Sequence, residues 1–244
     1  MRDVTEDGFL NNRLKLRQPK RGFRAGLDAV MLAAAVPAGA GETALELGAG
    51  VGTASLCVAL RTGCDVTGLE IDPELARLAN QNAVLNAMAD RVRFETADAL
   101  TWPPDRRFDH VFCNPPFHDD TGQRSPDAHR VRALQDAGTL KDWVRSGLKH
   151  VGSKGSFTII LRADRSGEVL AALPSKGIGI FPLRPRAEDP PKRIIVQWSD
   201  GGGGLPQSPG LILHQPDGRY TAEADAVLRG ASSLPIGAPW PTNP

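Results

Sequence analysis

Short apolar runs alternate along the chain with longer amphipathic segments, which is the pattern of strands followed by helices. The apolar runs predict seven strands, at residues 43–47, 64–69, 92–96, 108–113, 156–161, 178–183 and 194–198. The spacing between them predicts helices at residues 51–60, 73–85, 140–151 and 166–173. This alternation predicts an α/β fold with a mostly parallel sheet and helices on both faces. Since no helix separates the last two strands, we expect them to form a hairpin with one strand antiparallel.

The two ends of the chain add smaller elements. Residues 9–16 alternate in polarity about Asn11 and Asn12, and asparagine tolerates positive φ, so this segment predicts a small hairpin. Residues 25–36 are apolar and rich in alanine, which predicts a short helix. Near the other end, residues 211–214 predict an edge strand and residues 221–228 a final helix.

Composition excludes several classes of protein. The formal net charge of +1 argues against a globally basic nucleic-acid binder, although a local basic face remains compatible with it. The three cysteines are far apart and form no C-x-x-C motif, so we expect no metal site and no disulfide framework. No apolar run reaches the roughly 18 residues of a membrane span, and the first residues carry no secretory signal. We therefore expect a cytoplasmic protein.

A glycine-rich turn follows the first predicted strand. Ligands of open α/β sheets bind beyond the carboxyl ends of the strands, and Glu46, Gly48, Gly50 and Gly52 lie there. Glycines let the backbone turn tightly and approach a ligand closely. The dinucleotide fingerprint would need glycine at position 53, where Thr53 stands, so a pyrophosphate cradle is disfavoured.

Carboxylates follow the next two strands. Glu70 can accept two hydrogen bonds from a ribose diol, a role that acids play at this place in nucleotide-binding sheets. Asp98 lies between two alanines that leave room for a flat ring, and it could accept from an adenine amino group. Asp72 is instead interpreted as the cap of the next helix.

The tetrapeptide Asn114-Pro115-Pro116-Phe117 follows the fourth strand. The exocyclic amino group of an adenine, like an amide, is a poor nucleophile because its lone pair is delocalised. Two acceptors on its N–H groups, the Asn114 side-chain oxygen and the Pro115 carbonyl, would free that lone pair for attack on a methyl group. The prolines would hold these acceptors rigidly, and Phe117 would stack on a planar substrate. We interpret all four residues as catalytic.

Together these motifs make the chain resemble the class I S-adenosylmethionine-dependent methyltransferases over residues 42–160. The resemblance implies a Rossmann-like, doubly wound, seven-stranded sheet with the last strand pair reversed. It implies S-adenosyl-L-methionine as cofactor, with Glu46, Gly48 and Gly50 along the methionine moiety, Glu70 on the ribose and Asp98 on the adenine. Asn114 counts among both the catalytic and the cofactor-binding residues.

A narrower resemblance covers nearly the whole chain. Residues 10–19, 22–30, 192–196 and 218–221 are similar to bacterial tRNA(Val) adenine-N6 methyltransferases. This implies methylation of N6 of an adenine in tRNA, with Asp28 and Arg24 closing over the methionine end of the cofactor. It also implies three parts: a basic hairpin and helix covering the cofactor site (1–40), a methyltransferase domain (41–231) and a proline-rich tail (232–244). Residues 118–138 depart from the pattern of that family.

Residues 13–24 contain six cations and no acid, and they could follow an RNA backbone by neutralising phosphates. The predicted RNA-binding residues are Arg13, Lys15, Arg17, Lys20, Arg21 and Arg24.

Three other functions fit the same motifs. The Asn-Pro-Pro-aromatic order also serves the amide of glutamine, as in a glutamine-N5 protein methyltransferase, but such enzymes usually carry a helical substrate domain for which this chain has no room. Guanine-N2 methylation of ribosomal RNA is the second alternative. The third is a non-catalytic RNA-binding module with a relic cofactor pocket.

Overall fold

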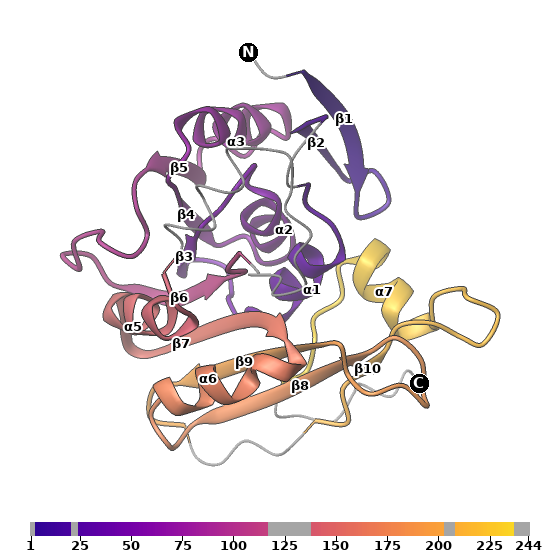
Figure 1. Cartoon of the computed structure of the whole chain (residues 1–244). Helices are drawn as coiled ribbons and strands as arrows, with labels where there is room; N and C mark the ends of the chain where they lie inside the picture. Colours follow the sequence, from indigo (N-terminus) through magenta and orange to yellow (C-terminus); the bar gives the residue numbers. More distant parts are fainter. Residues whose placement is uncertain (1–2, 21–23, 117–137, 203–207, 237–244) are drawn as a thin grey trace.

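The computed structural model describes residues 3–20, 24–116, 138–202 and 208–236. Its main sheet has eight strands (Figure 1). From one edge to the other they are β10 (Leu211–Ile212), β8 (Ile178–Arg184), β9 (Arg193–Ser199), β7 (Val151–Arg162), β6 (Phe108–Cys113), β3 (Thr43–Leu47), β4 (Asp65–Glu70) and β5 (Val92–Thr96). Only β9 runs antiparallel to its neighbours, which confirms the expected reversal within the last pair of long strands. The seven predicted strands are all present, and the short β10 extends the sheet beside β8.

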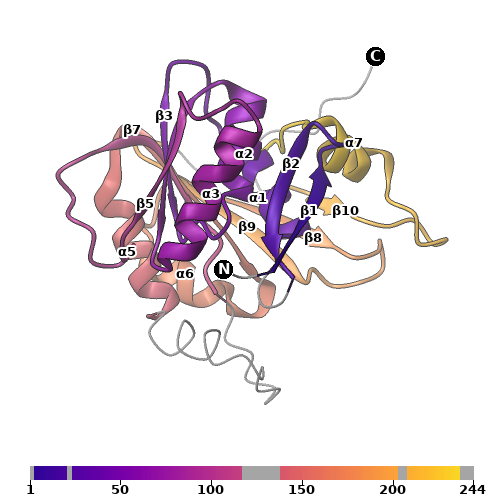
Figure 2. The ribbon, with the colours of Figure 1, turned by 90° about the horizontal axis from the view of Figure 1, so that it is seen from above.

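Helices cover both faces of the sheet, as the strand–helix alternation predicts (Figure 2). Two hydrophobic clusters, one on each side, form the core. On one side pack α1 (Leu27–Ala35), α2 (Thr53–Thr62), α3 (Pro73–Leu85) and α7 (Ala222–Gly230). On the other side pack α5 (Leu140–His150) and α6 (Ser166–Ala172). The order and direction of the strands place the ends of β3, β4, β5 and β6 at one edge, the carboxyl edge.

Local signals in the sequence account for where helices begin. Asp72 accepts hydrogen bonds from the backbone N–H groups of Glu74 and Leu75, and Pro73 takes the first helical position of α3. This confirms that Asp72 is a helix cap. Thr139 and Asp142 form a reciprocal capping box at the start of α5.

The N-terminal hairpin is longer than residues 9–16. It pairs β1 (Val4–Phe9) with β2 (Leu14–Pro19), antiparallel, in a separate two-stranded sheet. The turn holds Leu10, Asn11 and Asn12 at φ of 50°, 55° and 62°, so the asparagines do supply positive φ as predicted.

The free edge of β2 is covered by two asparagines of α3 rather than by another strand. Asn86 exchanges two hydrogen bonds with the backbone of Lys15, and Asn82 does the same with Arg17. Such an edge would otherwise present unpaired backbone groups. Asn82 is fully buried and also donates to the carbonyl of Val51, so one amide joins the hairpin to the turn that follows β3.

The N-terminal elements share one core with the rest of the chain. Leu14, Leu16 and the apolar residues of α1 belong to the same cluster as α2 and α7. The first residues of the proline-rich segment pack there too, because Leu234 is buried and donates its backbone N–H to Ala34. Of the helices that the structure describes, none has the length and apolarity to span a bilayer.

Candidate active site at the carboxyl edge

The three glycines of the turn after β3 differ in their surroundings, although all have positive φ. A Cβ on Gly48 would lie 2.9 Å from the ring of Trp143, and one on Gly52 would collide with the ring of Phe94. A Cβ on Gly50 would meet nothing within 4 Å. Gly48 and Gly52 are therefore required by packing, whereas Gly50 is the place where the backbone faces open space.

Glu70, the last residue of β4, ties this turn to the next one. Its carboxylate accepts the backbone N–H of Gly50 at 2.7 Å and that of Asp72 at 2.9 Å. Burial raises the pKa of Glu70, and the two backbone hydrogen bonds oppose that effect. The Glu70 side chain, which is expected to bind a ribose, is thus fixed beside the open position at Gly50.

Glu46 lies beneath the turn rather than on its surface. Its Oε2 accepts both the N–H and the hydroxyl of Ser55, in the first turn of α2. Burial raises the pKa of Glu46 to about 8, against the lowering effect of these hydrogen bonds. This carboxyl group fastens the start of α2 and so sets the shape of the glycine turn.

Asp98 follows β5 at the same edge and is half-buried. Its Oδ1 accepts the backbone N–H of Leu100 at 2.9 Å, and its Oδ2 accepts the hydroxyl of Thr101 at 3.1 Å. The carboxylate therefore shapes its own turn, and each oxygen keeps further capacity to accept from a ligand.

Asn114 directly follows β6. Its Oδ1 is shielded from solvent and has no hydrogen-bond partner among the residues that the structure describes. A buried amide oxygen without a partner costs about 1–3 kcal/mol, so such an atom marks a place where a donor is expected to bind. Pro115 is buried and Pro116 half-buried, while Phe117 lies outside the described residues.

Ile71 is a candidate that the sequence analysis missed. It follows Glu70 directly, and 56% of it is exposed although it is a large apolar residue. Because β4 and β5 are neighbours in the sheet, an exposed isoleucine just after β4 lies on the same edge as Asp98 and offers an apolar surface for a flat ring. The sequence signal that could have identified Ile71 was its position, one residue after the acid that ends β4.

Asp28 and Arg24 occupy different environments. Asp28, in the first turn of α1, forms an ion pair with Arg193 at 3.0 Å, and Arg193 begins β9 opposite the last residue of β7. That pair lies at the carboxyl edge. Arg24 instead holds the hairpin, because its guanidinium donates to Asp7, to the hydroxyl of Thr5 and to a backbone carbonyl.

Acidic side chains of β1 pair with cations of the basic stretch 13–24. Counting the charges within that stretch alone does not reveal these pairs. Antiparallel pairing sets Arg17 3.5 Å from Glu6, and Lys20 lies 3.6 Å from Asp3. Arg13 and Lys15 are exposed, and neither has an acidic partner within the described part of the chain. Arg21 lies outside the described residues.

The cysteines take no part in this site. Cys57, Cys64 and Cys113 are free and buried, and burial raises the pKa of the Cys57 thiol to about 12. No group of three or more histidine, cysteine or acidic side chains in the described ranges could hold a metal ion.

Comparison with known proteins identifies the family of the chain. The family model of the methyltransferase small domain matches residues 26–161. A tRNA1(Val) (adenine(37)-N6)-methyltransferase of Klebsiella pneumoniae is 28% identical over 89% of this chain and 91% of its own length. One from Shewanella loihica is 32% identical over 62% of this chain and 65% of its own. The crystal structure of a predicted O-methyltransferase from Agrobacterium tumefaciens superposes with a TM-score of 0.71 and 26% identity, over 88% of this chain and 100% of that one. The chain belongs to the methyltransferase small domain family, and it is an S-adenosylmethionine-dependent methyltransferase.

Proposed function

We propose that this protein methylates N6 of an adenine in tRNA. The observation that carries the proposal is the buried, unpartnered Oδ1 of Asn114 at the end of β6, followed by two prolines. It is supported by the names of the relatives that align with nearly the whole chain, which specify adenine N6 and tRNA1(Val).

The residues at the carboxyl edge fit S-adenosylmethionine. Gly50 opens on free space, Glu70 is fixed beside it, and Ile71 and Asp98 follow at the ends of the next strands. We assign the methionine moiety to the glycine turn, the ribose to Glu70 and the adenine to the surface between Ile71 and Asp98. When bound, the cofactor supplies a methyl group on a positively charged sulfur, ready for nucleophilic attack.

The protein's part in the reaction is to prepare the nitrogen nucleophile. The Oδ1 of Asn114 and the carbonyl of Pro115 accept the two N–H groups of the adenine amino group, and this draws the nitrogen towards a tetrahedral geometry. Its lone pair is then free to attack, and the two prolines keep both acceptors in place. No strong base is needed, since the nitrogen becomes acidic once it carries the methyl group.

Among the predicted RNA-binding residues, Arg13 and Lys15 have the most freedom to meet phosphates, because the guanidinium or ammonium groups of Arg17, Lys20 and Arg24 face acids of the hairpin. We propose that residues 1–40 cover the cofactor site and guide the RNA towards it. We propose that the protein acts in the cytoplasm, where its tRNA substrate would be found.

The test is transfer of labelled methyl groups from S-adenosylmethionine to separate tRNA, ribosomal RNA and protein fractions, followed by analysis of the modified nucleosides or amino acids. We expect label in tRNA as N6-methyladenosine. Label as N2-methylguanosine, as N5-methylglutamine or on a ribose or other oxygen would overturn the substrate. A lack of transfer to every fraction, with cofactor bound, would favour the non-catalytic module.

A further inference from the structure

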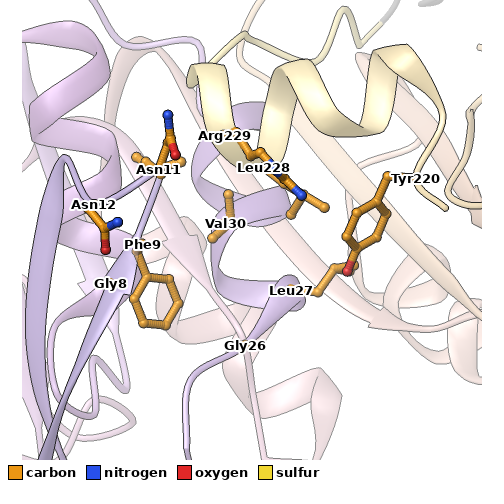
Figure 3. Close-up of a pocket in the computed structure, with 11 residues that line it drawn as sticks. Gly8, Phe9, Asn11, Asn12, Gly26, Leu27, Val30, Tyr220, Leu228 and Arg229 are labelled. Carbon is orange, nitrogen blue, oxygen red and sulfur yellow. The ribbon is translucent and has the colours of Figure 1, made fainter.

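A hollow of about 370 Å³ lies between the turn of the N-terminal hairpin, the first turn of α1 and helix α7 (Figure 3). Three segments far apart in the sequence build its walls. None of the residues assigned above to the cofactor or to the target adenine lines it. The hollow is therefore separate from the site at the carboxyl edge.

Aromatic rings stand on two sides of this hollow. Phe9 comes from the hairpin, and Tyr220 from the segment just ahead of α7 (Figure 3). Leu27 and Val30 of α1 lie between them. Tyr220 stacks on His214 with ring centroids 4.9 Å apart and planes inclined by 27°, which holds the orientation of its ring. Flat apolar walls of this kind suit a planar ligand.

Two amides and a guanidinium supply the polar part of the lining. Asn11 and Asn12 are exposed, and within the described part of the chain their side chains make no hydrogen bond. They are presented by a turn in which Leu10, which is not a glycine or asparagine, also has positive φ. Backbone strain of this kind persists where the surrounding structure or a function maintains it. Arg229 lines the same hollow and is paired with Asp225 at 2.8 Å.

One end of the hollow lies at the same edge of the sheet as the active site. Helix α1 leads into β3, so its first turn lies at the carboxyl edge, and Asp28, next to Leu27, meets Arg193 there. Tyr220 bridges to His214, which follows the carboxyl end of β10. The exposed cations Arg13 and Lys15 flank the hairpin turn at the other end of the hollow, where the backbone of Lys15 pairs with Asn86 and Arg13 donates to the carbonyl of Gly230.

We propose that this hollow binds an unpaired nucleobase of the substrate RNA, at a nucleotide near the methylated adenine. The inference rests on the proposed function, because it takes RNA as the substrate. Proteins recognise single-stranded RNA by stacking splayed bases on aromatic rings and by hydrogen bonds to the base edges. Phe9 and Tyr220 provide the stacking surfaces, and the amides of Asn11 and Asn12 can both donate to and accept from a base edge. The cations beside them suit the flanking phosphates.

Tyr220 offers a direct readout because the chain contains one tyrosine. Incorporation of 3-fluorotyrosine gives a single ¹⁹F resonance from the wall of the hollow. We expect that resonance to shift or broaden when a bacterial tRNA1(Val) transcript is added. An otherwise identical RNA with an abasic residue at one position near the target adenine should leave it unchanged, and scanning that position identifies the bound nucleotide.

Kinetics supply the second test. Tyr220→Ala should raise KM for tRNA about tenfold, the typical effect of losing one base–aromatic stack, without raising KM for S-adenosylmethionine. Tyr220→Phe keeps the ring and should restore most of the affinity. The RNA with the abasic residue should lose about tenfold with the unaltered protein and lose little more with Tyr220→Ala. Val84→Ala, an exposed apolar residue of α3 outside both sites, is the matched control.

Different results would contradict the proposed base-binding hollow and the proposed methylation of tRNA. If the protein methylates tRNA normally while the ¹⁹F resonance does not move and Tyr220→Ala has an unchanged KM, this inference alone is wrong. If the unaltered protein neither methylates nor binds RNA, the proposed function fails, and this inference fails with it.

Discussion

Polar side chains gather at both edges of the sheet, but the two groups differ in how fully their members are paired. At the amino edge, Glu42, Asp109, His110 and Ser156 make up what we call the amino-edge cluster, in which His110 and Ser156 are buried while Glu42 and Asp109 reach solvent. His110 contacts Ser156 Oγ at 2.9 Å and Glu42 Oε2 at 3.0 Å, and Asp109 accepts two hydrogen bonds from Thr43. At the carboxyl edge, Asn114 Oδ1 has no partner among the described residues, and Gly50 faces open space.

The comparison shows that residue types alone do not identify a site. Ser156, His110 and Glu42 have the composition of a hydrolase triad, in which a serine, a base and an acid lie in hydrogen-bonding sequence. Yet Ser156 is only 3% exposed within β7, and its hydroxyl is already bonded to His110. The amino-edge cluster joins strands. At the carboxyl edge, by contrast, the Asn114 oxygen can still accept a hydrogen bond and the exposed Ile71 can still pack against a flat ring.

The largest predicted effect comes from the opposite behaviour of two glutamates. The hydrogen bond from His110 lowers the pKa of Glu42, whereas burial raises that of Glu46 to about 8. Between its ordinary pKa of about 4.5 and 8, folded Glu46 keeps a proton that the unfolded chain releases. The stability it contributes is present at low pH and is lost as pH rises towards 8, by an amount on the order of a few kcal/mol.

Denaturant unfolding from pH 5 to pH 9 measures this dependence. Glu46→Gln retains an acceptor for Ser55 and should flatten the curve in that window. A curve for Glu46→Gln as steep as that of the unaltered protein would show that Glu46 is ionised in the folded state.

The second effect separates packing from ligand access within the glycine turn. Gly48→Ala should cost about 2–4 kcal/mol of unfolding free energy, because the new Cβ meets Trp143 and φ is positive. Gly50→Ala should lower the unfolding free energy by only about 1 kcal/mol, because its Cβ has room and only the positive φ is unfavourable. Gly50→Ala should nevertheless weaken S-adenosylmethionine binding, which calorimetry measures. Equal stability losses, or unaltered cofactor affinity of Gly50→Ala, would remove the distinction.

A smaller effect concerns the N-terminal hairpin. Lys15→Ala should lower the slope of log affinity for tRNA against log salt by about 0.7–0.9, the change for one lost phosphate contact. Arg17→Ala should change it less, because Arg17 already faces Glu6. Filter binding over a salt series checks this, and equal changes would mean that the Glu6 pairing does not hold in the complex.

The smallest effect is expected at the amino edge. Ser156→Ala removes one hydrogen bond and should cost about 1 kcal/mol of stability without changing the rate of methyl transfer. A substantial fall in turnover for a correctly folded Ser156→Ala protein would break the comparison between the two edges.

Much of this fold was predictable because the signals are local. Buried strands of a parallel sheet appear as continuous apolar runs, and Asp72-Pro73 marks the start of α3 by its own hydrogen bonds. The reversal of β9 followed from the missing helix between it and β8. Within the site, the order of Glu70, Asp98 and Asn114 along successive strand ends was enough to bring them to one edge.

What the sequence did not reveal depends on partners distant in the chain. The acids that neutralise Arg17 and Lys20 come from β1, and they become neighbours only through strand pairing. The hydrogen bonds from Asn82 and Asn86 to the edge of β2 join residues about 70 positions apart. Likewise, packing against Trp143 separates the role of Gly48 from that of Gly50, and no spacing within the turn encodes that difference.

The most direct test of the central claim is single-turnover methylation by Asn114→Ala. With cofactor and tRNA both saturating, the rate of methyl transfer should fall by about 10²–10³, comparable to the removal of one fixed polar group from a transition state, while the Kd for S-adenosylmethionine stays near that of the unaltered protein. An unchanged single-turnover rate would contradict the claim that the open acceptor at the end of β6 activates the nucleophile.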